Sequence, residues 1–330
     1  MHARYCFSGI ILALQASSLN FESIKITTIK PIISTYGYIT SWVAECFFAP
    51  DTTKISEELI SLQHQSPDRL AKIEPSWPIR DKIVIIQLES FDFNILNYKI
   101  NNKEITPFLN KILIKSCVFK LRSYHNVSSA DMDYALLSDG IPSSEIVSYM
   151  VRDIPYNNSL PHFLQKHGYH TVAWHGNVGN YFNRSYNFKR MGFDEVWFRE
   201  DLNHLKLKHS GFGIRNAEIF RLSSKKINTA NSPEFHFIIT LDSHGPFDFI
   251  SNEEKMIFPN SQQWQQNYFN SMYVLDRSLQ EYIESLPVGT LVVLYGDHSS
   301  GVKYGDFYPS CNGSVENVPC IVHVCKANIS

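Results

Sequence analysis

The sequence predicts an α/β fold with a mostly parallel central sheet flanked by helices. Two observations lead to this prediction. Continuous apolar, β-branched runs, which are typical of strands buried on both faces, recur between residues 82 and 325. Segments with a helical spacing of apolar residues separate these runs, and such alternation is typical of a parallel sheet.

The expected strands are short and strongly apolar. KIVIIQL at 82–88 is the first, and YHTVAWH at 169–175 follows a glycine that ends a helical segment. FHFIITL at 235–241 and TLVVLYG at 290–296 have the same character, and CIVHVC at 320–325 is a candidate last strand. Runs of this kind indicate a sheet that is covered on both faces.

The expected helices lie between these strands. Segment 106–116 begins with a Thr and a Pro, which is typical of a helix N-terminus. Segment 159–168 repeats that pattern and ends on Gly168, and segment 265–286 is long and amphipathic.

Composition divides the chain into three parts. Residues 1–65 are expected to be a membrane-proximal or packing segment, residues 66–81 a proline-containing linker, and residues 82–330 the main domain. Residues 1–18 resemble a short signal peptide or the tail of a membrane helix. Their apolar core of about ten residues is shorter than the ~18–20 that a spanning helix needs.

The overall composition is that of a globular protein. Apolar residues make up 44% and charged residues 19%, and the net charge is -2. Because the chain has no Lys/Arg run, we expect no nucleic-acid partner. The six cysteines form no CxxC pair, and Cys311, Cys320 and Cys325 are equally compatible with a disulfide or with free buried thiols.

Side chains capable of chemistry follow the expected strands, where ligands bind in parallel sheets. Glu89 follows 82–88, and Asp297 and His298 follow 290–296. This mixture of oxygen and nitrogen ligands is suited to a divalent metal such as manganese or zinc. A helix cap at Glu89 and a simple turn at the Gly-Asp-His segment are the structural alternatives.

Two further strand ends carry candidate ligand-binding residues. Asp242, Ser243 and His244 follow 235–241, and His175 ends the expected strand at 169–175. The loop after His175 contains the remaining polar candidates, which are Asn177 and Arg184.

The adjacent serines Ser128 and Ser129 have two interpretations. A serine hydroxyl becomes a good nucleophile when its oxygen contacts a metal or when a base removes its proton. The same residues, followed by Asp131 and Asp133, are also typical of a helix N-cap with acidic first-turn residues. The two interpretations are compatible.

Several motifs together resemble the lipoteichoic-acid synthase group, which includes the periplasmic phosphoglycerol transferases and belongs to the sulfatase and alkaline-phosphatase superfamily. The resemblance covers residues ~80–325, and its motifs occur in the family's order: IVIIQLESF, SSADMDY, SLPHFLQKHGYHTVAWHGN, YFNR, MGFDEVWF, ITLDSHGPF and VVLYGDHSSG. It implies a sulfatase-like, alkaline-phosphatase-like α/β sandwich.

The resemblance also implies roles for individual residues. One divalent metal, often manganese, with magnesium or zinc as alternatives, would lie among Glu89, Ser129, Asp297 and His298, with Ser129 as the nucleophile. The implied substrate-contacting residues are Arg184, His244, His175, Phe182 and Asn177. The sequence departs from the family pattern at three of these positions: Ser129 replaces the usual Thr, Phe182 replaces Trp, and Asn177 is a candidate replacement for an acid.

The implied activity is transfer of a glycerol-phosphate group from phosphatidylglycerol to a glycan or polymer hydroxyl through a covalent intermediate on Ser129. The expected place is the cell envelope, on the membrane surface, with the periplasmic face preferred to a Gram-positive surface. The alternatives are a phosphoethanolamine transferase, a phosphodiesterase or sulfatase-like hydrolase of the same superfamily, and a non-catalytic binder of anionic glycans or lipid headgroups. The family's membrane helices are absent from the sequence, so we expect an excised catalytic domain, a shortened relative or a fragment.

Overall fold

A computed structural model describes residues 52–63, 80–256, 263–305 and 316–326. The helices are α3 (Thr52–Gln63), α5 (Pro107–Leu113), α6 (Ala130–Ser138), α7 (Leu160–Lys166), α8 (Arg184–Arg190), α9 (Asn216–Thr229) and α10 (Gln263–Ser285), with short 3-10 turns at Phe93–Ile95, Ser148–Met150 and Tyr181–Asn183. The strands are β1 (Lys82–Leu88), β2 (Lys99–Ile100), β3 (Lys103–Glu104), β4 (Cys117–Arg122), β5 (His170–His175), β6 (Glu195–Trp197), β7 (His209–Ser210), β8 (Gly213–Ile214), β9 (Glu234–Ile239), β10 (Leu291–Gly296) and β11 (Asn317–Val324).

Seven of these strands form one central sheet in the order β4-β11-β10-β1-β9-β5-β6. The five strands from β10 to β6 pair in parallel, whereas β11 and β4 are antiparallel to their neighbours. The predicted mostly parallel α/β fold is therefore confirmed, and the predicted strands and helices are present with bounds that differ by a few residues.

Strand β4, like β6, α8 and α9, is an element that the sequence pattern did not predict. It lies at the edge of the sheet, and nearly all of its residues are exposed. Its sequence CVFKLR is rich in apolar residues, but the run is short and shows neither strict alternation nor an unbroken apolar stretch of strand length.

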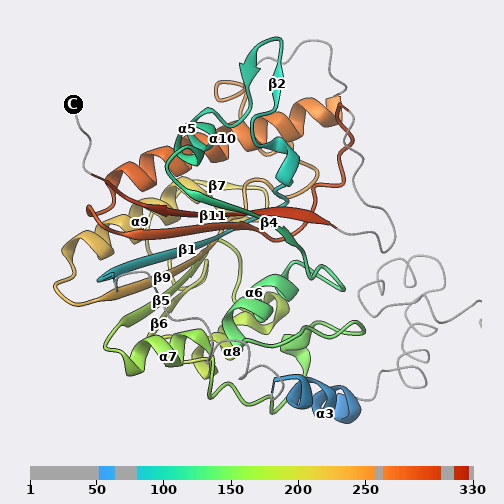
Figure 1. The fold of residues 1–330 in the computed structure, drawn as a ribbon, viewed down its shortest axis with the longest axis vertical. Coiled ribbons are helices and arrows are strands. Elements are labelled where there is room, and N and C mark those ends of the chain that lie inside the picture. Colours follow the sequence, from blue (N-terminus) through green and yellow to red (C-terminus); the bar gives the residue numbers. More distant parts are fainter. Residues whose placement is uncertain (1–51, 64–79, 257–262, 306–315, 327–330) are drawn as a thin grey trace, which may run out of the picture.

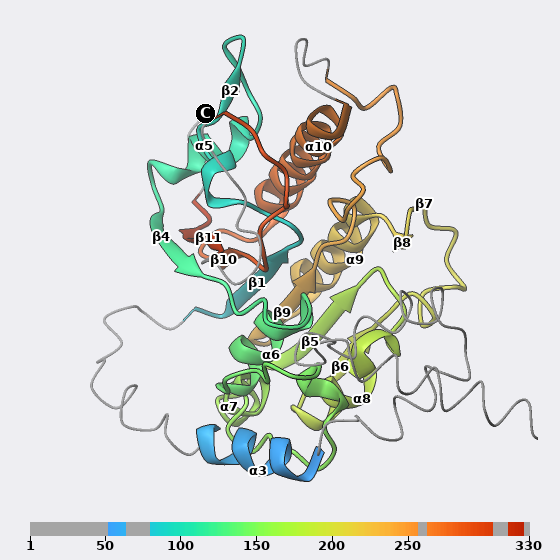
Figure 2. The same ribbon diagram turned by 90° about the vertical axis from the view of Figure 1, so that its right-hand side faces the viewer.

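Helices cover both faces of the sheet (Figure 1, Figure 2). α5, α9 and α10 pack on one face, together with alternate β1 residues such as Val84 and Ile86. α3, α6, α7 and α8 lie on the other face, where Ile85 of β1 is buried. Because successive side chains of a strand point to opposite faces, the unbroken apolar run of β1 serves both layers.

Helix α10 shows why the long amphipathic segment is helical. Five of its buried residues follow one another at steps of three or four, as one stripe of a helix requires: Tyr268, Met272, Leu275, Leu279 and Tyr282. Asp276 of the same helix caps α5, since its two carboxylate oxygens accept the backbone N–H groups of Phe108 and Leu109, each at 2.8 Å.

Several expectations concern residues outside the described part of the chain. These are the signal-like residues 1–18, most of the expected linker and Cys311. Within the described part, Cys320 and Cys325 are free thiols, and no helix combines the length and apolar character needed to cross a membrane. Helix α3 buries Ile55 and Leu59 against the α6–α8 side of the molecule.

Candidate active site

Two neighbouring strands bring the predicted metal ligands to one edge of the sheet. β1 and β10 pair in parallel with Leu88 opposite Gly296, and the backbone N–H of Asp297 donates to the carbonyl oxygen of Leu88 at 3.1 Å. Glu89 and Asp297 therefore leave the carboxyl edge at the same level. This is the edge at which α/β sheets bind ligands.

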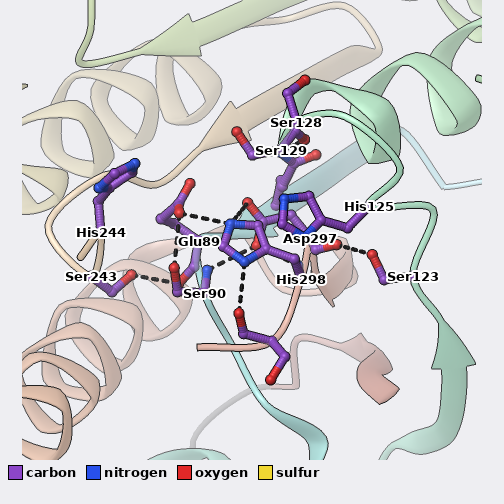
Figure 3. A network of polar contacts seen from close by, with 12 residues as sticks. Glu89, Ser90, Ser123, His125, Ser128, Ser129, Ser243, His244, Asp297 and His298 are labelled. Atoms are coloured by element: carbon purple, nitrogen blue, oxygen red, sulfur yellow. Dashed lines mark hydrogen bonds and ion pairs between the residues drawn. The ribbon is translucent and has the colours of Figure 1, made fainter. Parts of the chain in front are cut away.

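Glu89, Asp297 and His298 form a compact group (Figure 3). Nε2 of His298 lies 3.1 Å from Oε1 of Glu89 and 3.8 Å from Oδ2 of Asp297. One ligand atom from each residue lies within 4.8 Å of the other two. Nδ1 of His298 donates to the carbonyl oxygen of Ser299 at 2.8 Å, which leaves Nε2 facing the carboxylates.

The charges of these three residues are strongly coupled. Burial disfavours the ionised form of Glu89, but the hydrogen bond and positive charge of His298 outweigh burial and lower the pKa of Glu89. Burial, followed by the charge of Glu89, raises the pKa of Asp297 well above its usual range. Burial disfavours the imidazolium of His298, but Asp297 and Glu89 raise its pKa well above the usual value. The site therefore favours a positive charge between its two carboxylates.

One oxygen of Asp297 is left for a ligand. Oδ1 accepts the backbone N–H groups of Ser90 at 2.8 Å and of His298 at 2.6 Å. Oδ2 is buried and accepts no hydrogen bond from the described residues. Two carboxylates and one imidazole are a suitable ligand set for Mn²⁺ or Zn²⁺, so the residues present fit a divalent cation.

The two adjacent serines lie in different environments. Oγ of Ser128 accepts the N–H of Ala130, the first residue of α6, at 3.2 Å, and Ser128 is buried. Ser129 is half-buried, and among the described residues its hydroxyl has no hydrogen-bond partner. The carboxylate of Asp131 accepts three further N–H groups from the loop before the helix. The capping interpretation therefore applies to Ser128 and Asp131, and the Ser129 hydroxyl stays available.

A buried glutamine connects Ser129 to the sheet. The side-chain amide of Gln87, two residues before Glu89, donates to the carbonyl oxygen of Ser129 at 3.4 Å. The amide oxygen of Gln87 accepts the hydroxyl of Tyr295, two residues before Asp297, at 2.6 Å. The N-terminus of α6 is thus tied to the strands that carry the metal-ligand candidates, and Figure 3 shows Ser129 beside that group.

Arg184 is held by an acid on another helix. Its Nε donates to Oδ2 of Asp133 at 2.7 Å, and both side chains are almost fully buried. Burial alone disfavours the guanidinium, but the charge of Asp133 raises the pKa of Arg184, so Arg184 stays charged. Its Nη2 is buried without a hydrogen-bond partner among the described residues. The guanidinium also lies over the ring of Phe182, with Cζ at 5.2 Å from the centroid.

His175 ends β5 in a buried position. Its Nδ1 donates to the carbonyl oxygen of Ile239 on β9 at 3.2 Å. Burial and the positive charge of Arg184 lower the pKa of His175 to about 3, so the imidazole is neutral and its Nε2 can accept a hydrogen bond.

His244 and Asn177 lie on two loops at the same edge. Nδ1 of His244 donates to the carbonyl oxygen of Gly245 at 2.7 Å, and the charge of His244 contributes to the lowered pKa of Glu89. Asn177 is half-buried, and its Oδ1 accepts the N–H of Val178 at 2.8 Å. The side-chain oxygen of Asn177 is therefore engaged within its own loop.

Sequence reasoning took Asp133 only as an acidic first-turn residue and assigned no role to Asp92. Asp133 lies four residues after Ser129, and its partner Arg184 is 51 positions away, so no local pattern connects the two. Asp92 is buried and accepts hydrogen bonds from both side-chain hydroxyls of Ser299 and Ser300 and from the N–H of Ser300, at 2.6–2.9 Å. It fixes the loop that follows His298, and the only signal in the sequence is an acid three residues after Glu89.

Comparison with known proteins gives a consistent result. The family model described as Sulfatase matches residues 81–325. The chain is 24% identical, over 262 residues, to the lipoteichoic acid synthase-like protein YvgJ of Bacillus subtilis, covering 73% of this chain and 42% of that protein. The chain spans less than half the length of the curated relatives that it matches.

Solved structures share the fold. The lipoteichoic acid synthase LtaP from Listeria monocytogenes superimposes with a TM-score of 0.62 at 23% identity, covering 76% of this chain and 66% of that one. The Streptococcus pyogenes phosphoglycerol transferase GacH, in complex with sn-glycerol-1-phosphate, gives a TM-score of 0.58 at 16% identity, with coverage of 81% and 75%.

Proposed function

The chain belongs to the sulfatase family, and from this premise we propose that it is a metal-dependent phosphoglycerol transferase with Ser129 as its nucleophile. One combination of residues at the sheet edge supports the proposal best. It consists of a three-residue ligand group, together with a serine hydroxyl and a buried arginine donor that have no hydrogen-bond partner in the described part of the chain. Relatives named as lipoteichoic acid synthases and as a phosphoglycerol transferase support the choice of the transferred group.

Glu89, Asp297 and His298 would hold one divalent cation, manganese in preference to magnesium or zinc, with Ser129 as the fourth ligand. When bound, such a cation supplies positive charge that favours the ionised Ser129 hydroxyl and the charged phosphoryl oxygens. The orphaned Oδ2 of Asp297 and the free Ser129 hydroxyl are the atoms that support this ligand set.

In the first step, Oγ of Ser129 attacks the phosphorus of phosphatidylglycerol. A bond forms between Oγ and phosphorus, and the bond from phosphorus to the diacylglycerol oxygen breaks. The proton that Ser129 loses is balanced by the proton that the diacylglycerol oxygen gains. The glycerol phosphate stays on Ser129 as a phosphodiester.

Arg184 and His175 would position the phosphoglycerol group. The free Nη2 of Arg184 donates to a phosphoryl oxygen, and Asp133 holds the guanidinium in the orientation that permits this. The neutral His175 accepts a hydrogen bond from a glycerol hydroxyl. Phe182 packs against the guanidinium and forms a wall of the same site, with Asn177 nearby on the loop after β5.

In the second step, a hydroxyl of a glycan or polymer acceptor attacks the same phosphorus. The bond from phosphorus to Oγ breaks, Ser129 regains a proton, and the acceptor carries the glycerol phosphate. His244, half-buried at the end of β9, would contact the substrate and transfer the proton. With a lipid donor and a glycan or polymer acceptor, this activity would lie at the membrane surface of the cell envelope, and we propose the periplasmic face.

The test is the intact mass of the metal-loaded protein after incubation with phosphatidylglycerol. We expect a mass increase of one phosphoglycerol group in the parent protein and in Ser128→Ala, and none in Ser129→Ala. Ser128→Ala is the matched control because it removes a neighbouring hydroxyl that caps α6.

Other outcomes would assign a different function. An adduct only with phosphatidylethanolamine would indicate a phosphoethanolamine transferase, and release of glycerol phosphate to water without an acceptor would indicate a phosphodiesterase. If the parent protein formed no adduct and released no diacylglycerol, the transferase proposal would be wrong and headgroup binding without catalysis would remain.

A further inference from the structure

One glutamate contacts two segments that both touch the candidate metal ligand His298. Glu316 directly precedes β11 and is half-buried. Its Oε2 accepts the backbone N–H of Ser299 at 2.8 Å, and its Oε1 lies 3.2 Å from Nδ1 of His125. The two oxygens of this carboxylate therefore hold the loop after His298 and the loop that carries His125.

The first contact acts on His298 through the backbone of Ser299. Nδ1 of His298 donates to the carbonyl oxygen of Ser299 at 2.8 Å. An imidazole that donates from Nδ1 keeps Nε2 for a cation, and hydrogen bonds of this kind orient the ligands of metal sites. Glu316 holds the N–H of Ser299, and Asp92 accepts its hydroxyl at 2.7 Å. The orientation of the His298 ring therefore depends on how Ser299 is held.

The second contact acts on His298 through the ring of His125. The two rings are stacked, with centroids 4.2 Å apart and an interplanar angle of 17° (Figure 3). Nearly parallel rings direct their in-plane lone pairs along separate lines, so His125 supports the His298 ring and does not share a cation with it. The backbone N–H of Ser123 also donates to the carbonyl oxygen of Glu316 at 2.9 Å, which joins the His125 loop to β11.

Glu316 makes these contacts as an ionised carboxylate. Burial opposes ionisation of Glu316, but the hydrogen bonds from His125 and from the N–H of Ser299 outweigh burial and lower the pKa of Glu316. Hydrogen bonds to an ionised acceptor are stronger than those between neutral groups. One carboxylate thus anchors both the Ser299 backbone and the His125 ring.

We propose that Glu316 is a positioning residue for His298, acting through the Ser299 backbone and the stacked His125 ring without contacting a cation itself. In this role it keeps Nε2 of His298 turned toward the two buried carboxylates before a cation binds. Because a ligand that is already oriented loses less freedom on binding, the affinity for the cation should depend on Glu316. That dependence rests on the metal of the proposed function, whereas the orientation of the ring does not.

The first test is the dissociation constant of Mn²⁺ for the full chain, measured from the signal of free Mn²⁺ in electron paramagnetic resonance. Glu316→Ala should weaken binding by about 10–100-fold, the scale of losing a residue that supports a metal ligand. Glu316→Gln should recover most of this loss, because its amide oxygen can still accept the Ser299 N–H while its amide nitrogen faces His125.

Glu195→Ala is the matched control for this titration. Glu195 is half-buried like Glu316, and its Oε1 lies 2.9 Å from Nε2 of a histidine, His170, at the start of β6. It has the same kind of contact as Glu316 but does not touch the loop after His298. The Glu195→Ala variant should therefore bind Mn²⁺ as tightly as the parent protein.

The second test needs no metal. In metal-free protein labelled with ¹⁵N at histidine, the Nδ1–H proton of His298 should give a hydrogen-bonded, slowly exchanging NMR signal, which is assigned by its loss in His298→Ala. The signal should persist in Glu316→Gln and Glu195→Ala. It should exchange faster with solvent in Glu316→Ala, because the Ser299 carbonyl oxygen is then held less firmly.

The two measurements separate this inference from the proposed function. If Glu316→Ala kept both the NMR signal and the Mn²⁺ affinity of the parent, the positioning role would be wrong. Equal loss of affinity in Glu316→Ala and Glu316→Gln, with the signal retained in both, would assign the effect to charge and also overturn the inference. If the parent bound no Mn²⁺ but its His298 signal depended on Glu316, the positioning role would stand and the proposed metal would not.

Discussion

Nε of Arg184 lies 2.7 Å from Oδ2 of Asp133, and this contact joins the first turn of α8 to the first turn of α6 in the protein interior. The side chains are 3% and 0% exposed. The helix that directly follows the candidate nucleophile Ser129 is thereby fixed to Arg184, the residue proposed to bind the phosphoryl group. The Asp133–Arg184 pair should therefore affect both the stability of the fold and the binding of the phosphoryl group.

Asp133→Asn should destabilise the fold, because it leaves the Arg184 guanidinium buried and uncompensated. We expect the free energy of unfolding to fall by about 3–5 kcal/mol, the scale of breaking a buried ion pair. Arg184→Met combined with Asp133→Asn should recover part of this loss, since no buried charge remains. Urea unfolding of the parent, both single variants and the double variant measures the coupling. Purely additive losses would show that the two side chains are not coupled.

Ser128→Ala should lose more stability than Ser129→Ala, although only Ser129→Ala should lose activity. Ser128→Ala loses the bond to the N–H of Ala130 and should cost about 1 kcal/mol. Ser129→Ala removes a hydroxyl that has no partner among the described residues, so the change should stay within about 0.5 kcal/mol. Thermal unfolding in metal-free buffer compares them. A larger loss for Ser129→Ala would mean that its hydroxyl has a structural role.

Manganese should stabilise the parent protein, since it would bind the folded state alone. At a concentration about 100 times its dissociation constant, a ligand adds about 2.7 kcal/mol, and a chelator should reverse the effect. Asp297→Asn should abolish this increment. Asp242→Asn is the matched control, because Asp242 is a buried aspartate at the same sheet edge that bonds to Ser210 and Asn216 instead. That variant should lose stability yet retain the manganese increment.

Asp276 should make stability depend on pH. Burial raises the pKa of Asp276 to about 7, although the N–H groups of Leu109 and Phe108 oppose the shift. The folded state therefore binds this proton more tightly than the unfolded chain, so stability falls as the pH rises from about 4 to about 7. The full shift corresponds to roughly 4 kcal/mol.

Asp276→Asn removes this titration, although it also leaves one acceptor fewer for the N-terminus of α5. The stability advantage of the parent protein over Asp276→Asn should shrink between about pH 5 and about pH 8. Urea unfolding at both pH values checks this, and an advantage that stayed constant would contradict the assignment to Asp276.

The central strands were predictable from the sequence because burial on both faces requires unbroken apolar runs. β1, β5, β9 and β10 have this property, and the predicted helices α5 and α7 each carry a Pro in their first turn. Edge strand β4 was missed because its short segment CVFKLR shows neither strict alternation nor an unbroken apolar run. The antiparallel direction of β11 depends on pairing partners rather than on composition.

Part of the candidate site was also predictable. Glu89, Asp297 and His298 follow directly on apolar strands, and the carboxyl ends of parallel strands meet at one edge. The sequence alone was therefore enough to predict that these three ligand candidates lie close together. It could not distinguish the two interpretations of the serine pair, since a helix cap and a nucleophile require the same residue types.

Only the tertiary structure decided the remaining relationships. It engages the Ser128 oxygen in the cap, while the Ser129 hydroxyl has no partner within the described ranges. It also pairs Asp133 with Arg184 and brings Glu316 to His125 across 191 positions of the chain. The physical reason is that a hydrogen bond or an ion pair depends on distances of about 3 Å in space. Local propensity and hydrophobic periodicity determine which elements form, whereas packing between distant elements determines which polar side chains meet.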